Sequence, residues 1–339
     1  MNLVPRIALA LGLAALIALI VGQGAGTLAG LLSHAGWILL LLVPLQAIPM
    51  LFDVLGWRAL LAAPTQVSGL FLIAWIRQAI NRLLPVASVG GEIVGVRLLR
   101  RQGVGGMSAA ASVIVELMLG LVAQYLFVAL GVVCLFARVS PTAESAGGTR
   151  VLQALLIGLA VSLPPLILMI IVLRHGRVFL RIERVARRFL GGWLSHDLLT
   201  DQGARLDAEV RGIFAGSMRV GRSLLWQLGG YVLGVSEVWF ALRWLGHPVS
   251  VGDALVLESL TQAAKSVFFM VPAALGVQEA GLMGVGLLLG LSADVALALS
   301  LAKRLREVVY GVPALFIWQW MEVSGAAGAS GVRPDPPLG

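Results

Sequence analysis

The length of the apolar runs constrains the fold of this chain most strongly. Six runs approach or exceed the roughly 20 residues that a helix needs to cross a bilayer. They are residues 7–21, 36–55, 108–136, 151–173, 224–244 and 295–321. Only 12% of the residues are charged, against about 25% in soluble domains, and the mean hydropathy is +0.94. The sequence therefore predicts an all-α polytopic membrane protein with about six full transmembrane helices, forming one integral membrane domain over residues 1–322.

Two further apolar regions, 68–99 and 254–290, are each interrupted near the middle. The stretch LLPVASVGGE ends at Glu92, and MVPAALGVQE ends at Glu279. Proline breaks a helix and glycine allows a tight turn, so we expect two re-entrant helical hairpins with the glutamates near their tips. A pair of full spans in each region is the alternative. The residues expected to shape the hairpins are Pro85, Gly90, Gly91, Pro272 and Gly276.

The two interrupted regions share a spacing that indicates an internal repeat. Proline precedes glutamate by seven residues in both, and a glycine follows each glutamate after eleven more, at Gly103 and Gly290. A long apolar run with a glutamate in its first half comes next, at Glu116 and Glu307. This shared order favours a duplication. The repeats would cover about residues 36–136 and 224–321.

The distribution of arginine predicts the orientation. Segment 174–222 has far more arginines than acidic residues, which places it in the cytoplasm. Both termini then lie in the cytoplasm, and the hairpins open to opposite sides, as in an inverted repeat. Part of this segment reads as a basic amphipathic helix on the inner leaflet; a helix packed on other loops is the alternative. The tail 323–339 is rich in glycine and proline, and we expect it to be disordered.

The basic character does not require a nucleic-acid partner. The net charge is +8, and only two of the 25 basic residues are lysines. Arginine-rich cytoplasmic loops that contact anionic lipids explain this excess in a membrane protein. The single cysteine and the four histidines show no metal-ligand spacing. We therefore expect no metal site, no cofactor and no nucleic-acid binding.

Charged residues inside apolar runs are the candidate functional residues. A charge at the bilayer centre costs about 2.5–3.5 kcal/mol even on the lenient insertion scale, so it needs a partner. We predict a polar cavity that holds a lipid headgroup while the tails stay in the bilayer; pairs that simply pin helices together are the alternative. The residues predicted for this cavity are Glu92, Glu279, Arg82, Arg97, Glu116, Lys265, Lys303, Arg304 and Glu307. Arg306 is a further available cation, and Asp53 and Glu237 could join the cavity or lie at interfaces.

The stretches INRLLPVASVGGEIVGVRLLRRQG and VPAALGVQEAG resemble the lysylphosphatidylglycerol synthase transmembrane-region family, also described as flippase-like membrane proteins. With ALALSLAKRLREVVYGVP, the second stretch is most similar to the hopanoid-biosynthesis-associated branch. The resemblance extends from the first apolar run to about residue 321. It implies lipid handling in the bacterial inner membrane, and its motif places Gln278 beside Glu279 in the substrate site. The chain departs from the bifunctional synthases because we find no soluble transferase domain.

Three functions remain open from the sequence. The first is a flippase-like transporter that moves hopanoids, hopanoid-bearing lipids or anionic lipids between leaflets or toward the outer membrane. Glu92 or Glu279 could couple this movement to a proton. The second is an integral-membrane transferase on a lipid-linked substrate, with Glu92 or Glu116 as general base. The third is a scaffold for lipid-biosynthesis enzymes, with the amphipathic helix as its docking surface.

Overall fold

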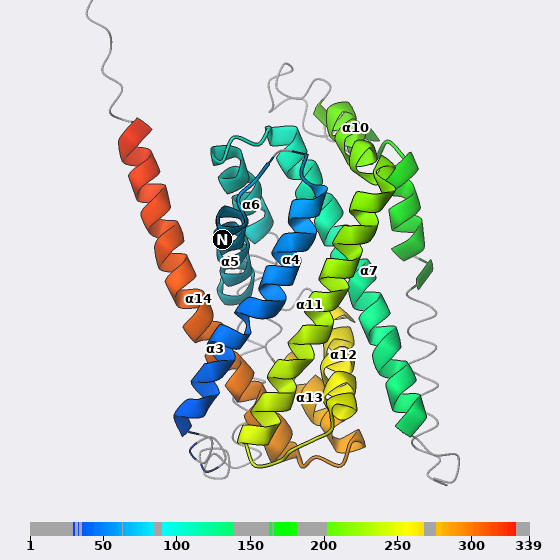
Figure 1. Cartoon of the computed structure of the whole chain (residues 1–339), viewed down its shortest axis with the longest axis vertical. Helices are drawn as coiled ribbons and strands as arrows, with labels where there is room; N and C mark the ends of the chain where they lie inside the picture. The colour runs from blue at the N-terminus through cyan, green and yellow to red at the C-terminus, as the bar shows by residue number, and fades with distance from the viewer. Residues whose placement is uncertain are drawn as a thin grey trace, which may run out of the picture.

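The computed structural model describes residues 30, 33, 36–62, 64–84, 90–138, 163–164, 166–181, 202–267 and 276–329. Within these residues the regular elements are all helical, as the apolar runs predict. The elements are η1 (Gly36–Leu41), α3 (Leu42–Leu45), α4 (Ala47–Leu60), α5 (Val67–Leu83), α6 (Gly90–Arg101), α7 (Gly106–Arg138), α10 (Gln202–Ala215), α11 (Ser217–Trp244), α12 (Val251–Val267), α13 (Val277–Leu288) and α14 (Ala293–Ala329). Figure 1 shows α4, α7, α11 and α14 running along the long axis of the molecule.

Two of the described helical stretches are long and apolar enough to cross a membrane. They are Gly36–Leu60, which joins η1, α3 and α4, and Gly106–Ala137 on α7. The predicted spans at 224–244 and 295–321 fall within α11 and α14, which have 28 and 37 residues. The predicted span at 7–21 and most of the one at 151–173 lie outside the described residues.

One face of α14 carries a stripe of exposed apolar side chains. Leu305, Val308, Val312, Phe316 and Trp320 are all exposed and recur every three or four residues, so they lie on the same side of the helix. A stripe of this length would be costly in water. It is the surface expected where a helix contacts hydrocarbon.

Each interrupted region forms two helices that pack side by side. α5 pairs with α6, and α12 pairs with α13. The breaks fall between Leu83 and Gly90 and between Val267 and Val277, where the sequence predicts them. Pro85 and Pro272 lie outside the described residues.

The lengths of the helices recur in the two halves of the chain. α5 and α12 each have 17 residues, and α6 and α13 each have 12. After α6 and α13 the chain turns at Gly103 and Gly290, with φ of 88° and 80°, and a long helix follows each glycine. The order α4–α5–α6–α7 thus recurs as α11–α12–α13–α14.

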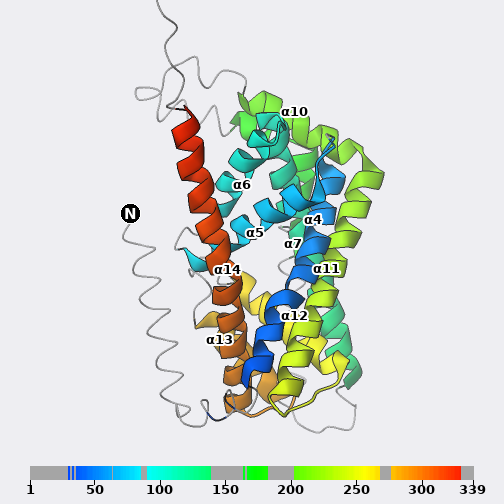
Figure 2. The ribbon, with the colours of Figure 1, turned by 60° about the vertical axis from the view of Figure 1, so that its left-hand side comes forward.

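Exchanging these two sets of helices preserves part of the pattern of packing. α4 packs along α11, α5 contacts α14, and α12 contacts α7. The packing of α7 on α11 has no counterpart of similar extent between α14 and α4, so the correspondence is partial. Figure 1 and Figure 2 both show the α5–α6 hairpin toward one end of the molecule and the α12–α13 hairpin toward the other.

Glycines on α6 allow it to lie close to α5. A Cβ on Gly91 would lie 2.5 Å from the backbone oxygen of Arg77, and a Cβ on Gly95 would meet the side chain of the same arginine. The four-residue spacing puts both glycines on one face, as in close helix pairs of membrane proteins. We expected Gly90 and Gly91 to turn the chain, but neither has a positive φ. Instead, both glycines lie in the first turn of α6. Residue 91 must be small because the backbones of α5 and α6 approach each other there.

Gly276 does turn the chain. It has φ of 78° and directly precedes α13. Residues with a side chain rarely adopt this conformation. The two hairpins therefore use glycine differently: for close packing in the first, and for a turn in the second.

The start of segment 174–222 packs on other helices. Val178 and Phe179 lie against a cluster that includes Val115 of α7 and Val210 of α10. The carboxylate of Asp207 accepts hydrogen bonds from the backbone N–H groups of Phe179 and Leu180, at 3.1 and 3.0 Å. The predicted amphipathic helix, residues 177–194, lies outside the described residues from residue 182 onward.

The last helix is longer than we expected. α14 continues to Ala329, whereas composition placed the start of a disordered tail at residue 323. Three alanines between residues 326 and 329 favour continuation of the helix despite the nearby glycines. Residues 330–339 lie outside the described part of the chain.

Candidate functional site

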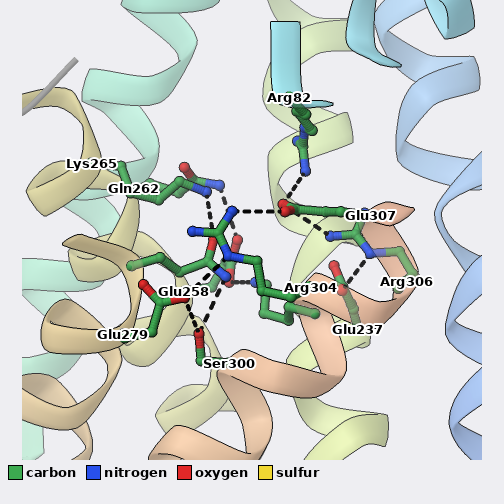
Figure 3. A network of polar contacts seen from close by, with 12 residues as sticks. Arg82, Glu237, Glu258, Gln262, Lys265, Glu279, Ser300, Arg304, Arg306 and Glu307 are labelled. Carbon is green, nitrogen blue, oxygen red and sulfur yellow. Dashed lines mark hydrogen bonds and ion pairs between the residues drawn. The ribbon is translucent and has the colours of Figure 1, made fainter. Parts of the chain in front are cut away.

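Glu307 of α14 is surrounded by arginines (Figure 3). Arg82 Nη1 lies 2.8 Å from Glu307 Oε1, and Arg304 Nη1 lies 3.1 Å from Oε2. Arg306 Nη2 is 3.9 Å from Oε1. Arg82 ends the first hairpin helix α5, whereas Glu307 belongs to the second half, so this cluster joins the two halves.

Glu279 is fully buried in the first turn of α13, with 0% of its side chain exposed. Arg304 Nε donates to Glu279 Oε1 at 3.1 Å, and Ser300 Oγ donates to the same oxygen at 3.3 Å. Arg304 thus contacts both Glu279 and Glu307. A carboxylate this deeply buried requires such partners, because an isolated charge in the interior is strongly unfavourable.

Two further ion pairs connect α14 to its neighbours. Lys303 Nζ lies 2.5 Å from Glu258 Oε2 of α12. Arg306 Nε lies 2.9 Å from Glu237 Oε1 of α11. One turn of α14 therefore supplies cations to three neighbouring helices, since residues 303, 304 and 306 point in different directions around the helix axis.

The first half contains a separate cluster around Arg77 of α5. Its guanidinium pairs with Glu92 of α6 and lies 2.7 Å from Glu116 Oε2 of α7. It also stacks over the ring of Trp57, 4.7 Å from the centroid, where a cation–π attraction adds to the ion pairs. Asn81 donates to Glu92 Oε1 at 3.0 Å and accepts from the backbone N–H of Gly91 at 2.9 Å. This cluster holds three helices at the tip of the first hairpin.

A cavity of about 370 Å³ lies between the two halves. Its volume falls within the roughly 300–1,000 Å³ of ligand sites. Six helices line it: α4, α5 and α7 from the first half, and α11, α12 and α14 from the second. Its charged lining residues are Asp53, Arg82, Glu116, Glu237, Glu258, Lys265, Lys303, Arg306 and Glu307.

The structure brings about half of the predicted site residues to this cavity. The ones that line it are Arg82, Glu116, Lys265, Lys303 and Glu307. Glu92, Glu279, Gln278 and Arg304 lie behind this layer, and each hydrogen-bonds to a lining residue or to a partner of one. Lys265 Nζ, for example, donates to Gln278 Oε1 at 3.0 Å.

Arg97 lies away from the cavity, contrary to our expectation. Its side chain is 62% exposed and pairs with Glu322 at 2.9 Å. The reason is helix register. Gly91 and Gly95 face α5, and residue 97, two positions beyond Gly95, points elsewhere on α6.

Sequence reasoning missed Arg77 and Glu258. Arg77 is followed by Gln78 on α5 and lies four positions before Asn81, so one polar face was visible. Glu258, Gln262 and Lys265 stand at i, i+4 and i+7 on α12, which also defines one face. This spacing could have identified Glu258. Asp53 and Glu237, for which two placements were open, both line the cavity.

The site offers paired charges and neutral hydrogen-bonding groups. Glutamine side chains at 46, 78, 124, 227 and 262 line the cavity with the charged residues. Among the described residues, no group of three or more His, Cys, Asp or Glu side chains is placed to hold a metal ion. The arrangement suits non-covalent binding of a polar, charged group inside an apolar helical protein.

One comparison with known proteins identifies a family for this chain. A family model described as the lysylphosphatidylglycerol synthase TM region matches residues 6–314. A search of curated proteins found no match, and a search of solved structures found none either. The matched region contains both hairpins and every residue that lines the cavity. The chain therefore belongs to the lysylphosphatidylglycerol synthase TM-region family and is a membrane protein with a lipid-related function.

Proposed function

We propose that this chain is a flippase-like lipid transporter of the bacterial inner membrane, with both termini in the cytoplasm. The observation that carries the proposal is the charged cavity between two matched sets of helices. Secondary transporters commonly bind their substrate at such an interface, near the bilayer midplane. A lipid headgroup would occupy the cavity while its acyl or hopanoid tail stays in the hydrocarbon.

Two properties of the hairpins support an inverted repeat with re-entrant segments. α6 and α13 have 12 residues each, which is about 18 Å of helix. The hydrocarbon core is about 30 Å thick, so neither helix can cross it alone. The hairpins also lie toward opposite ends of the molecule (Figure 2), as two copies in opposite orientation would.

Alternating access would follow from movement of one half against the other. The ion pair between Arg82 and Glu307 joins the halves at the cavity. A charged headgroup could compete for either partner and so favour a different relative position of the halves. The energy difference between the two positions would then depend on whether the headgroup is bound.

The substrate would be a polar membrane lipid. The resemblance at the two proline–glutamate stretches supports hopanoids, hopanoid-bearing lipids or anionic lipids, and lipid-biosynthesis enzymes as partners. A transferase is less well supported. Glu92 and Glu116, the candidate general bases, both form ion pairs with Arg77, an arrangement that also explains them as structural residues.

The proposal is tested by lipid translocation in vesicles that contain the purified protein. Phosphatidylglycerol and phosphatidylethanolamine, each with the same fluorescent acyl chain, report movement when dithionite quenches the outer leaflet. Wild-type protein should move at least one of them. Arg82→Gln and Glu307→Gln should slow this movement about tenfold, because each removes a charge-assisted hydrogen bond at the cavity.

The matched control is Arg97→Gln, which removes the same kind of charge from an exposed position outside the cavity. It should leave the rate unchanged. Size-exclusion chromatography and the melting temperature in detergent would show that each variant is folded. If folded wild-type protein moves neither lipid, the proposed function is wrong.

A further inference from the structure

The charged residues that line the cavity pair off almost completely. Four of its five carboxylates form an ion pair with a basic side chain. These pairs are Glu116–Arg77, Glu237–Arg306, Glu258–Lys303 and Glu307–Arg82. Each of these carboxylates thus already has a cationic partner within the protein.

Asp53 is the carboxylate that remains. It lies on α4, is partly buried and lines the cavity. Its Oδ1 faces α11 at Gly230, where a Cβ would lie 2.9 Å away. No hydrogen bond or ion pair joins Asp53 to another residue in the part of the chain that the structure describes. Its carboxyl group thus faces the cavity with its acceptors unused.

Lys265 is the cation that remains. It lies on α12 and lines the same cavity. Its ammonium donates to the neutral amide oxygen of Gln278, at 3.0 Å, and no carboxylate among the described residues forms an ion pair with it. An ammonium has three donors, so two remain for a ligand.

We infer that the cavity takes a zwitterionic headgroup, with its alkylammonium group at Asp53 and its phosphate at Lys265. This inference rests on the proposed function and names the substrate class of the same site. A lone charge is costly at membrane depth, and a ligand of opposite charge removes that cost. A purely anionic headgroup would satisfy Lys265 but leave Asp53 without a partner and repelled.

The two residues belong to different halves of the molecule. Asp53 is on α4 of the first half, and Lys265 is on α12 of the second. A headgroup with both charges would therefore connect the halves, whereas one with a single charge would be bound by one half only. The neutral side chains of Gln78 and Tyr231 also line the cavity and can hydrogen-bond the glycerol or the remaining phosphate oxygens.

The test compares two lipids that differ only beyond the phosphate. Fluorescent phosphatidylethanolamine carries the ammonium, and fluorescent phosphatidylglycerol with the same acyl chain carries hydroxyl groups instead. In vesicles with wild-type protein, phosphatidylethanolamine should move about tenfold faster, the ratio expected for one charge-assisted contact. Asp53→Asn should abolish this preference by slowing only phosphatidylethanolamine, while Lys265→Gln should slow both lipids to a similar extent.

Two further variants make the result specific. Asp53→Glu keeps the charge and should keep the preference. Asp294→Asn removes the same charge in the first turn of α14, outside the cavity, and should leave both rates unchanged.

The inference is overturned if wild-type protein moves the two lipids equally fast, or if Asp53→Asn slows both alike. The second result would indicate an inorganic cation or a structural role at Asp53. In either case the proposed function stands, because lipid still moves. If wild-type protein moves neither lipid, the proposed function fails and the inference fails with it.

Discussion

At the scale of single residues, the first hairpin depends most on the side chain of Arg77. It is buried, pairs with Glu92 and Glu116, and stacks on Trp57. Removing one member of a buried ion pair typically costs about 3–5 kcal/mol, because the remaining charges lose their partner. We therefore expect Arg77→Met to lower the stability by about that amount, seen as a large drop in melting temperature in detergent.

Arg97→Met provides the comparison for this prediction. Its exposed pair with Glu322 should contribute about 0–1 kcal/mol, as surface pairs do. The double variant Arg77→Met with Glu116→Gln should recover part of the loss, because it removes one of the two unpaired carboxylates. Similar melting temperatures for the Arg77→Met and Arg97→Met proteins would contradict this account of the cluster.

The sequence was informative about individual charges up to a limit. A glutamate in an apolar run stands out, and Glu116, Glu279 and Glu307 all lie inside the protein. Of these three, only Glu116 and Glu307 line the cavity. The sequence could not distinguish Arg77 from Arg97, because both lie near the first hairpin. Helix register and the position of α14 decide their different environments. Arg77 contacts residues on three other helices, whereas Arg97 pairs with Glu322 of α14, which is distant in the sequence.

At the scale of helices, the close packing of α6 against α5 depends on Gly91. A Cβ there would lie 2.5 Å from a backbone oxygen of α5, so neither helix can adjust a side chain to make room. Gly91→Ala should destabilise the hairpin by about 1–3 kcal/mol, the usual cost of overpacking. The melting temperature and the protease sensitivity of the purified protein would measure this.

Gly284→Ala on α13 is the matched control for Gly91→Ala. Gly284 lies in a helix of the same length, and nothing lies within 4 Å of a Cβ there. This change should be neutral or slightly stabilising, because alanine favours helix over glycine. If the two changes altered the melting temperature equally, helix propensity rather than close packing would explain the glycine on α6.

The position of the hairpins was predictable, but their packing was not. Proline followed by glycine and glutamate marks a break in an apolar run, and both breaks occur where that pattern predicts them. Gly103 and Gly290, which share the same spacing from the two glutamates, both have positive φ. The role of Gly91 was misread because a glycine that turns the chain and a glycine that admits a neighbouring helix look alike in one sequence.

The arrangement of the whole molecule places the charged cavity where the two sets of helices meet. A ligand bound where the two sets of helices meet contacts both sets. Membrane class and family could be predicted from composition and motif, and the family match confirms them. The contacts between α5 and α14 and between α7 and α12 could not, because they join residues from different halves.

Lipid mass spectrometry on separated inner and outer membranes tests the central claim most directly. The comparison is between a strain that lacks this protein and its parent. We predict that every lipid is still made and that one amine-bearing phospholipid or hopanoid class accumulates in the inner membrane of the deficient strain. Wild-type protein should restore the distribution, and the Glu307→Gln protein should not. Complete absence of a lipid species would contradict transport and point to a failure of synthesis.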